Sequence, residues 1–311
     1  MLDRLLFVPS VAQTEWLHDS LPWMSALALP VAGRRFLDYA LESAQKFGFH
    51  LAGVLDWHFS QKLLADCGNL SARGLPVVYQ QGKGALLRGL NGLAHVVSPF
   101  TDPVRDGLAV VWGLCLTSHR PEEVTFEPLT DDECDDTPVG LYCRNEGRWM
   151  RILPQGLSVQ DVRSWYRLSK TVMANRWLFT LPGYSSEKDV HLGRNVVLER
   201  GTTVKAPVIL QDNVWCARNV QIDGNVIVGA GSFVGEEAHL ERTIVGDDTY
   251  VGVGIDLTDK IAVGRRIFDI ATGVWTDINE PGLARYIGNV GSGGLRRVWR
   301  FLLGASRGRR G

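Results

Sequence analysis

The feature that most constrains this chain is a six-residue repeat in its second half. An aliphatic or small apolar side chain returns at every sixth position from Leu192 to Leu240, and after one skipped residue the series runs from Val245 to Val263. A second β-branched or small residue stands two positions before each member, and Gly, Asp and Asn cluster in between. Because successive side chains of a strand point to opposite faces, each pair marks a very short strand with two inward side chains.

A period of six lets three such strands close one coil, and each coil buries its inner face only by stacking on the next. Antiparallel hairpins would need turn signals every 8–12 residues, and amphipathic helices would show a period of 3.6. Neither fits, so we predict a parallel β-helix with Ile222 and Val228 inward and Gln221 and Ile227 outward. The repeat resembles the hexapeptide repeat of left-handed β-helix proteins, which include acyltransferases and sugar nucleotidyltransferases.

The first half of the chain follows a different pattern. Short apolar runs alternate with helical stretches, which predicts an α/β sheet with crossover connections. A hairpin is expected around residues 145–147, and Ser158 is expected to start a further helix with Asp161 as its capping-box partner. The apolar runs are Leu5–Val8, Leu51–Leu55, Pro76–Tyr79 and Leu108–Trp112, and the helical stretches are Arg35–Phe47, Ser60–Cys67 and Ala85–Val96.

One segment carries a family resemblance. It consists of Leu29-Pro30-Val31-Ala32-Gly33-Arg34, Leu37-Asp38-Tyr39 and Leu41-Glu42. This segment resembles part of the sugar nucleotidyltransferases, such as mannose-1-phosphate guanylyltransferase and its glucose-1-phosphate relatives. The resemblance implies a Rossmann-type nucleotidyltransferase-like domain followed by a left-handed β-helix.

The same alignment shows that the catalytic motifs of that family are missing. No glycine precedes Gly33, so the glycine-rich phosphate loop is absent. The family lysine aligns with Ala26, and the family Asp that holds Mg²⁺ aligns with Leu114. Phosphoryl-type transfer depends on positioned cations and N–H donors, so we predict a catalytically silent relative with no metal site and no cofactor. Mg²⁺ is expected only under the alternative of an active but divergent sugar-1-phosphate nucleotidyltransferase.

Three further groups are candidate sites. Gln81, Gly82, Lys83 and Gly84 can form a ligand loop, because glycine permits close backbone approach and Lys83 offers a phosphate partner; a plain strand-to-helix turn explains them equally well. The acidic run 131–136 has no regular ligand spacing and is interpreted as a solvated loop. Under a third hypothesis, an acyltransferase acting on a sugar nucleotide, His191 or His239 would be the general base; both are expected to point outward from the coil.

The charge distribution and the cysteines of the chain limit which kinds of partner and which cellular compartment are expected. From Pro281 onward the chain has seven Arg and no acidic residue, whereas the other 280 residues carry 26 basic and 34 acidic side chains, which disfavours nucleic acid as a partner. Five scattered cysteines without a CxxC motif favour a reducing compartment. We expect a cytoplasmic protein without a signal peptide or membrane span.

The basic tail also contains an amphipathic helical pattern. Its apolar stripe includes Trp299, and Arg296, Arg297 and Arg300 lie beside it. Such a segment can contact an anionic membrane at its interface, here the inner membrane, or pack on protein; both interpretations stay open.

These observations define four regions and one role. We predict a degenerate nucleotidyltransferase-like domain over 1–157, a helical linker over 158–185, a left-handed β-helix over 186–275 and a basic amphipathic tail over 276–311. The expected role is accessory, in bacterial surface-polysaccharide or exopolysaccharide synthesis. The expected partners are a sugar nucleotide, polysaccharide-assembly proteins and a second copy of the chain.

Overall fold

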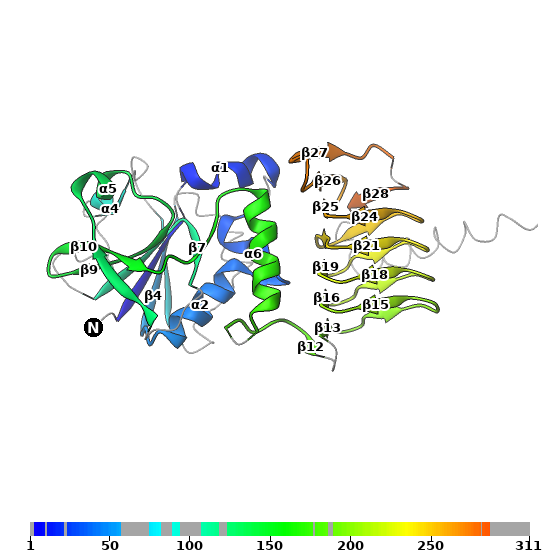
Figure 1. Ribbon diagram of the computed structural model, residues 1–311, viewed down its shortest axis with the longest axis horizontal. Helices are drawn as coiled ribbons and strands as arrows, with labels where there is room; N and C mark the ends of the chain where they lie inside the picture. Colours follow the sequence, from blue (N-terminus) through cyan, green and yellow to red (C-terminus); the bar gives the residue numbers. More distant parts are fainter. Residues whose placement is uncertain are drawn as a thin grey trace, which may run out of the picture. The chain divides into compact units, whose positions relative to one another are not determined.

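The computed structural model describes residues 3–9, 11–21, 24–56, 75–81, 89–93, 107–117, 123–176, 178–185, 189–280 and 282–286. The chain divides into two compact units, an N-terminal unit over 1–181 and a C-terminal unit over 182–311 (Figure 1). Helix α6 (Val162–Ala174), from the segment expected to link the domains, lies inside the N-terminal unit.

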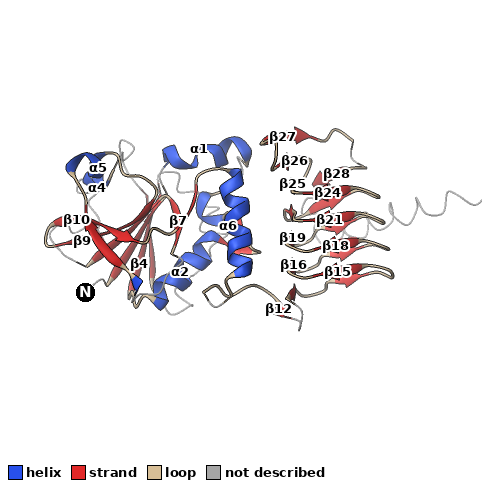
Figure 2. Cartoon of the chain, viewed as in Figure 1, coloured by secondary structure: helices blue, strands red, loops and turns tan. Residues whose placement is uncertain are grey.

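The N-terminal unit is built on one seven-stranded mixed sheet, as the α/β prediction expects (Figure 2). Strands β5, β4, β1 and β6 are mutually parallel, and β9, β10 and β8 continue the sheet in antiparallel pairs. The order across the sheet is β5 (Val77–Gln81), β4 (Leu51–Asp56), β1 (Arg4–Val8), β6 (Leu108–Trp112), β9 (Gly140–Asn145), β10 (Arg148–Leu153) and β8 (Thr125–Pro128).

The central strands of this sheet are buried because both faces are apolar. All five residues of β6 are buried, which is typical of a parallel strand covered on both sides. Two small ribbons accompany the sheet, β2 (Pro30–Val31) with β3 (Arg34–Arg35) and β7 (Leu114–Leu116) with β11 (Leu157–Val159). The helices besides α6 are α1 (Val11–Ser20), η1 (Ala26–Ala28), α2 (Phe36–Lys46), α4 (Leu90–Leu93) and α5 (Asp131–Asp135).

The sequence prediction for the start of α6 was wrong by three residues. Ser158 lies in β11, and Asp161 itself is the N-cap, because its carboxylate accepts from the backbone N–H of Ser164 at 2.6 Å. The Ser164 hydroxyl accepts in turn from the Asp161 N–H at 2.8 Å, which completes a capping box. The expected hairpin is confirmed: β9 and β10 pair across a turn in which Glu146 and Gly147 have positive φ.

The C-terminal unit consists of short strands stacked in three sheets, an arrangement consistent with a parallel β-helix (Figure 1). The first sheet contains β12 (Tyr184–Ser185), β13 (Val190–Leu192), β16 (Val208–Leu210), β19 (Val226–Val228), β22 (Ile244–Val245), β25 (Lys260–Val263), β26 (Arg266–Asp269) and β27 (Val274–Asp277). The second contains β14 (Val197–Leu198), β17 (Trp215–Cys216), β20 (Phe233–Val234), β23 (Thr249–Val251) and β28 (Ala284–Tyr286). The third contains β15 (Thr203–Lys205), β18 (Gln221–Asp223), β21 (His239–Glu241) and β24 (Asp256–Thr258).

The register of the stack follows the six-residue repeat. Val208 pairs with Val226 eighteen residues later, and Val228 pairs with Val245 seventeen residues later, where the sequence skips one residue. A second skip was not expected: Val245 pairs with Ala262, so Ala262 and not Val263 enters the core of the stack. The repeat therefore determines the strand positions up to Leu257, and the last step shifts by one residue.

The core of the stack contains the side chains that the repeat places inward. Ile222 and Val228 are fully buried members of one apolar cluster that runs through the coils. Ile227 lies outside that cluster, as expected, but only 4% of it is exposed, so an outward position is not always a solvent-exposed one. Asparagine recurs with positive φ at the corners between strands, for example at Asn213 and Asn219, because it tolerates the left-handed region better than most residues.

Candidate functional site

The carboxyl ends of the parallel strands form the first candidate site. Strands β4 and β5 lie on one side of β1 and β6 lies on the other, so the strand order reverses beside β1. In open α/β sheets, ligands bind outside the carboxyl ends of the strands at such a reversal. Here these ends are Val8 of β1 and Trp112 of β6.

At the ends of β1 and β6, backbone hydrogen bonding and buried apolar side chains occupy this edge. The Gly113 N–H donates to the Val8 carbonyl at 2.8 Å, so this amide is already used within the fold. Trp112 is 1% exposed, and Leu114, the position aligned with the family metal ligand, is fully buried. Leu114 pairs with Val159 in the β7–β11 ribbon, so its side chain is part of the packing. None of the side chains of residues 112–114 carries an oxygen atom that could bind a cation.

The segment that carries the family resemblance is also held by internal contacts. The Trp165 indole N–H of α6 donates to the Pro30 carbonyl at 2.6 Å, and the Tyr39 hydroxyl of α2 donates to the Ala32 carbonyl at 3.3 Å. Burial raises the pKa of Tyr39 well above its usual range, so the hydroxyl stays a neutral donor. Ala26, aligned with the family lysine, lies in the short helix η1.

The Gln81–Gly84 loop is only partly within the described residues. Gln81 is the last residue of β5, and since β5 is parallel to β4, it ends at the same edge of the sheet as β1 and β6. Gly82, Lys83 and Gly84 lie outside the described residues. The ligand-loop hypothesis therefore stays a prediction.

The acidic run 131–136 forms a short helix and a cap in place of the expected loop. Thr130 and Glu133 form the capping box of α5, and the Arg151 guanidinium donates to Glu133 at 2.6 Å. The backbone N–H of Thr130 and then Arg151 hold the pKa of Glu133 below its usual range. In the described part of the chain, no group of three or more His, Cys, Asp or Glu side chains is placed to hold a metal ion.

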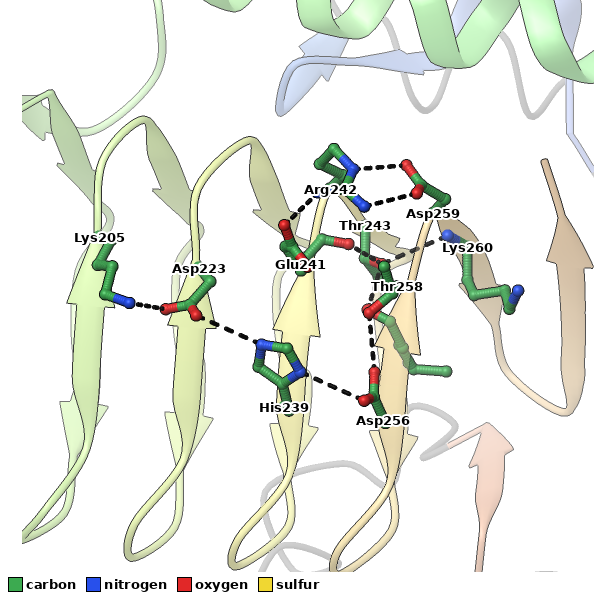
Figure 3. A network of polar contacts seen from close by, with 11 residues as sticks. Lys205, Asp223, His239, Glu241, Arg242, Thr243, Asp256, Thr258, Asp259 and Lys260 are labelled. Carbon is green, nitrogen blue, oxygen red and sulfur yellow. Dashed lines mark hydrogen bonds and ion pairs between the residues drawn. The ribbon is translucent and has the colours of Figure 1, made fainter. Parts of the chain in front are cut away.

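His239 lies in a polar network on the outer face of the third sheet of the C-terminal unit (Figure 3). Its Nε2 is 3.5 Å from the Asp223 carboxylate, and its Nδ1 is 3.4 Å from the Asp256 carboxylate. The network continues to Lys205, which contacts Asp223 at 3.1 Å, and to Thr258, which donates to Asp256 at 2.9 Å. The Thr258 hydrogen bond and the His239 contact hold the pKa of Asp256 below its usual value.

This geometry bears on the acyltransferase hypothesis. A catalytic histidine is held by a carboxylate at one ring nitrogen and presents the other to the substrate. At His239 both ring nitrogens face carboxylates, so neither nitrogen is left open toward a substrate as in that arrangement. The six-residue repeat could have predicted the contact between His239 and Asp256, since Asp256 follows His239 by one coil and pairs with it in register.

The two candidate histidines differ in their exposure. The His239 side chain is 28% exposed. His191 is the middle residue of β13 and lies between Val190 and Leu192, as expected for an outward position, but it is buried. The outward position therefore does not expose His191 to solvent, and burial removes it from direct access by a substrate.

The tail residues Arg296, Arg297, Trp299 and Arg300 lie outside the described residues, so the membrane and packing interpretations stay predictions. Among the helices that the structure describes, none combines the length and the apolar character needed to cross a bilayer. No protein-family model matches the chain, and no curated protein sequence matches it.

Proposed function

We propose that this chain is a catalytically silent relative of the sugar nucleotidyltransferases that binds a sugar nucleotide or a partner protein in bacterial surface-polysaccharide synthesis. Its C-terminal repeat is proposed to be a left-handed β-helix of the hexapeptide type. The family assignment depends on the resemblance at residues 29–42 and on the parallel strands with their reversal beside β1.

The observation that carries the loss of activity is Leu114. A nucleotidyltransferase needs a carboxylate there to hold the Mg²⁺ that neutralises the phosphates. A fully buried leucine supplies no oxygen ligand and blocks access by its packing against β11. The Gly113 N–H, which could have contacted a phosphate oxygen, is engaged by the Val8 carbonyl.

The test is a turnover assay combined with a binding assay on the full chain. We expect no release of pyrophosphate above background from a nucleoside triphosphate, a hexose 1-phosphate and Mg²⁺. We expect a nucleotide sugar to raise the thermal transition temperature, because a ligand that binds only the folded state stabilises it by mass action. Lys83→Ala should reduce that shift, and Lys46→Ala, outside the loop, should not.

The outcomes separate the alternatives. Protein-dependent release of pyrophosphate would favour the active but divergent nucleotidyltransferase. Stabilisation by acyl-coenzyme A, lost in His239→Ala, would favour the acyltransferase. If no nucleotide sugar shifts the thermal transition temperature, the sugar nucleotide is excluded as a ligand, and the accessory role would consist of binding a partner protein.

A further inference from the structure

A small apolar pocket in the N-terminal unit lies against one face of the sheet. It lies between α2 and the face of the sheet formed by β1, β6, β9, β10 and β8, and its cavity volume is about 60 Å³. The wall on the sheet side includes Leu5, Phe7, Ala109, Val111, Phe126 and Ile152. Phe126 is 49% exposed, which leaves that wall of the pocket accessible from solvent.

The helix contributes one polar group to this apolar pocket. Ala40, Ser43, Ala44 and Phe47 follow the i, i+3, i+4, i+7 spacing of one helix face, and all four line the pocket. Ser43 therefore occupies a position where the helix pattern calls for an apolar side chain. It is 4% exposed, and its Oγ has no hydrogen-bond partner among the residues that the structure describes.

An unpaired hydroxyl in such a place is unfavourable. Serine in a helix often donates to the carbonyl one turn earlier, but Ser43 does not. A buried water needs two to four polar partners. Among the described residues that line the pocket, the others with polar side-chain atoms are Cys115 and Thr117. The Cys115 thiol already accepts a hydrogen bond from Gly156, and burial raises its pKa to about 12, so it is a neutral group of little use to a water.

We propose that this pocket binds a small molecule that inserts a short branched alkyl group and offers one oxygen to the Ser43 hydroxyl. The volume sets the size: about 60 Å³ is less than half of the ~150 Å³ cavity that holds benzene, so a methyl-branched chain end fits and a whole ring does not. The apolar walls favour the alkyl group, and the hydroxyl selects for an oxygen. The site is independent of the proposed function.

The test uses the full chain with isobutanol and isobutyl chloride, which share a carbon skeleton and differ in the hydroxyl. Methyl NMR of alanine-labelled protein reports on Ala40, Ala44 and Ala109, which line the pocket. We expect saturable shifts at these three methyl groups, with isobutanol bound about fivefold more tightly, the effect of one net hydrogen bond between neutral groups. Ser43→Ala should remove the preference and keep the binding.

A matched control is Ser169→Ala. Ser169 on α6 is also a buried serine whose hydroxyl lacks a partner within the described ranges, but it is not among the lining residues of the pocket. The preference for isobutanol should therefore persist in this variant. Ala44→Leu should fill the pocket and abolish binding of both probes, and Ala109→Val serves the same purpose from the sheet side if the first variant does not fold. Equal affinities for the two probes, absence of saturable shifts, or an isobutanol preference that survives Ser43→Ala would each overturn the proposal.

Discussion

The two units of this chain differ in how far apart in the sequence their paired strands lie. In the C-terminal unit the parallel strand pairs join residues 17 or 18 positions apart, as Val208 pairs with Val226. In the N-terminal unit the central pairing joins Arg4 of β1 to Leu108 of β6, across most of the unit's length. A stack of local repeats can be recognised from its period, whereas a sheet assembled from distant strands leaves only short apolar runs in the sequence.

The difference extends to the candidate sites. In the C-terminal unit the repeat brings residues one coil apart into register, so that His239 meets Asp256 on the outer face. In the N-terminal unit the edge beside β1 and the pocket under α2 join residues from four or more separate strands and helices. A local repeat thus fixes surface neighbours directly, while sites in the sheet depend on the complete tertiary fold.

The largest expected effect tests whether the stacked core is continuous. Ile222→Asp places a charge inside the apolar cluster, where nothing pairs with it, and should lower the free energy of unfolding by about 3–5 kcal/mol. Hydrogen exchange by mass spectrometry over residues 189–280 measures the loss within this unit. The control is Gln221→Asp on the neighbouring exposed position, which should change little. Equal protection in the two variants would contradict the inward position of Ile222.

A second change tests the few polar side chains inside the stack. The Thr249 hydroxyl is fully buried and accepts from the Gly264 N–H at 2.9 Å. Thr249→Val keeps the shape and leaves that amide unpaired, so unfolding should become about 1–3 kcal/mol easier by urea denaturation. Thr249→Ser keeps the hydroxyl and should recover most of the loss. Equal stabilities of the valine and wild-type chains would mean that the hydroxyl only fills space.

A third change tests the N-cap of α6, a feature of the N-terminal unit that depends on residues adjacent in the sequence. Asp161→Ala removes the N-cap of α6 and should lower stability by about 1 kcal/mol, measured by urea denaturation monitored by circular dichroism. Asp161→Ser retains a capping oxygen and should lose much less. Ser158→Ala is the matched comparison, because the sequence pattern placed the helix start there. A larger loss of stability in Ser158→Ala than in Asp161→Ala would support the sequence-based prediction that the helix starts at Ser158.

The smallest expected effect is on the outer face of the third sheet. Asp256 is 67% exposed at its side chain, so Asp256→Asn should cost no more than about 0.5 kcal/mol at neutral pH. Because folding lowers the pKa of this carboxyl, its contribution is present above the unfolded pKa and is lost as pH falls through the folded pKa. The difference between variant and wild type, followed by thermal unfolding, should therefore shrink in acid. A difference that grows below the unfolded pKa would contradict this sign.

The sequence by itself predicted the positions of the stacked parallel strands up to Leu257. The inward positions of Ile222 and Val228 follow from the period alone, because every coil repeats the same alternation of inward and outward side chains. The sequence did not predict the shift to Ala262 at the last coil. Ala262 and Val263 are both apolar, so the repeat pattern looks the same whether or not one residue is skipped. The apolar runs of the first half likewise predicted strands but not their order.

Only the tertiary structure decided what surrounds each candidate side chain. The sequence shows a leucine at position 114, but the complete burial of Leu114 against β11 depends on a pairing with residues more than forty positions away. The sequence predicts that His191 points outward but not that it is buried. It also does not indicate that Ser43 lines a pocket or that the described residues supply no hydrogen-bond partner for its hydroxyl. The physical reason is the same in each case: alternation within a strand or helix is a local property, whereas burial and hydrogen-bond partners depend on which distant elements pack nearby.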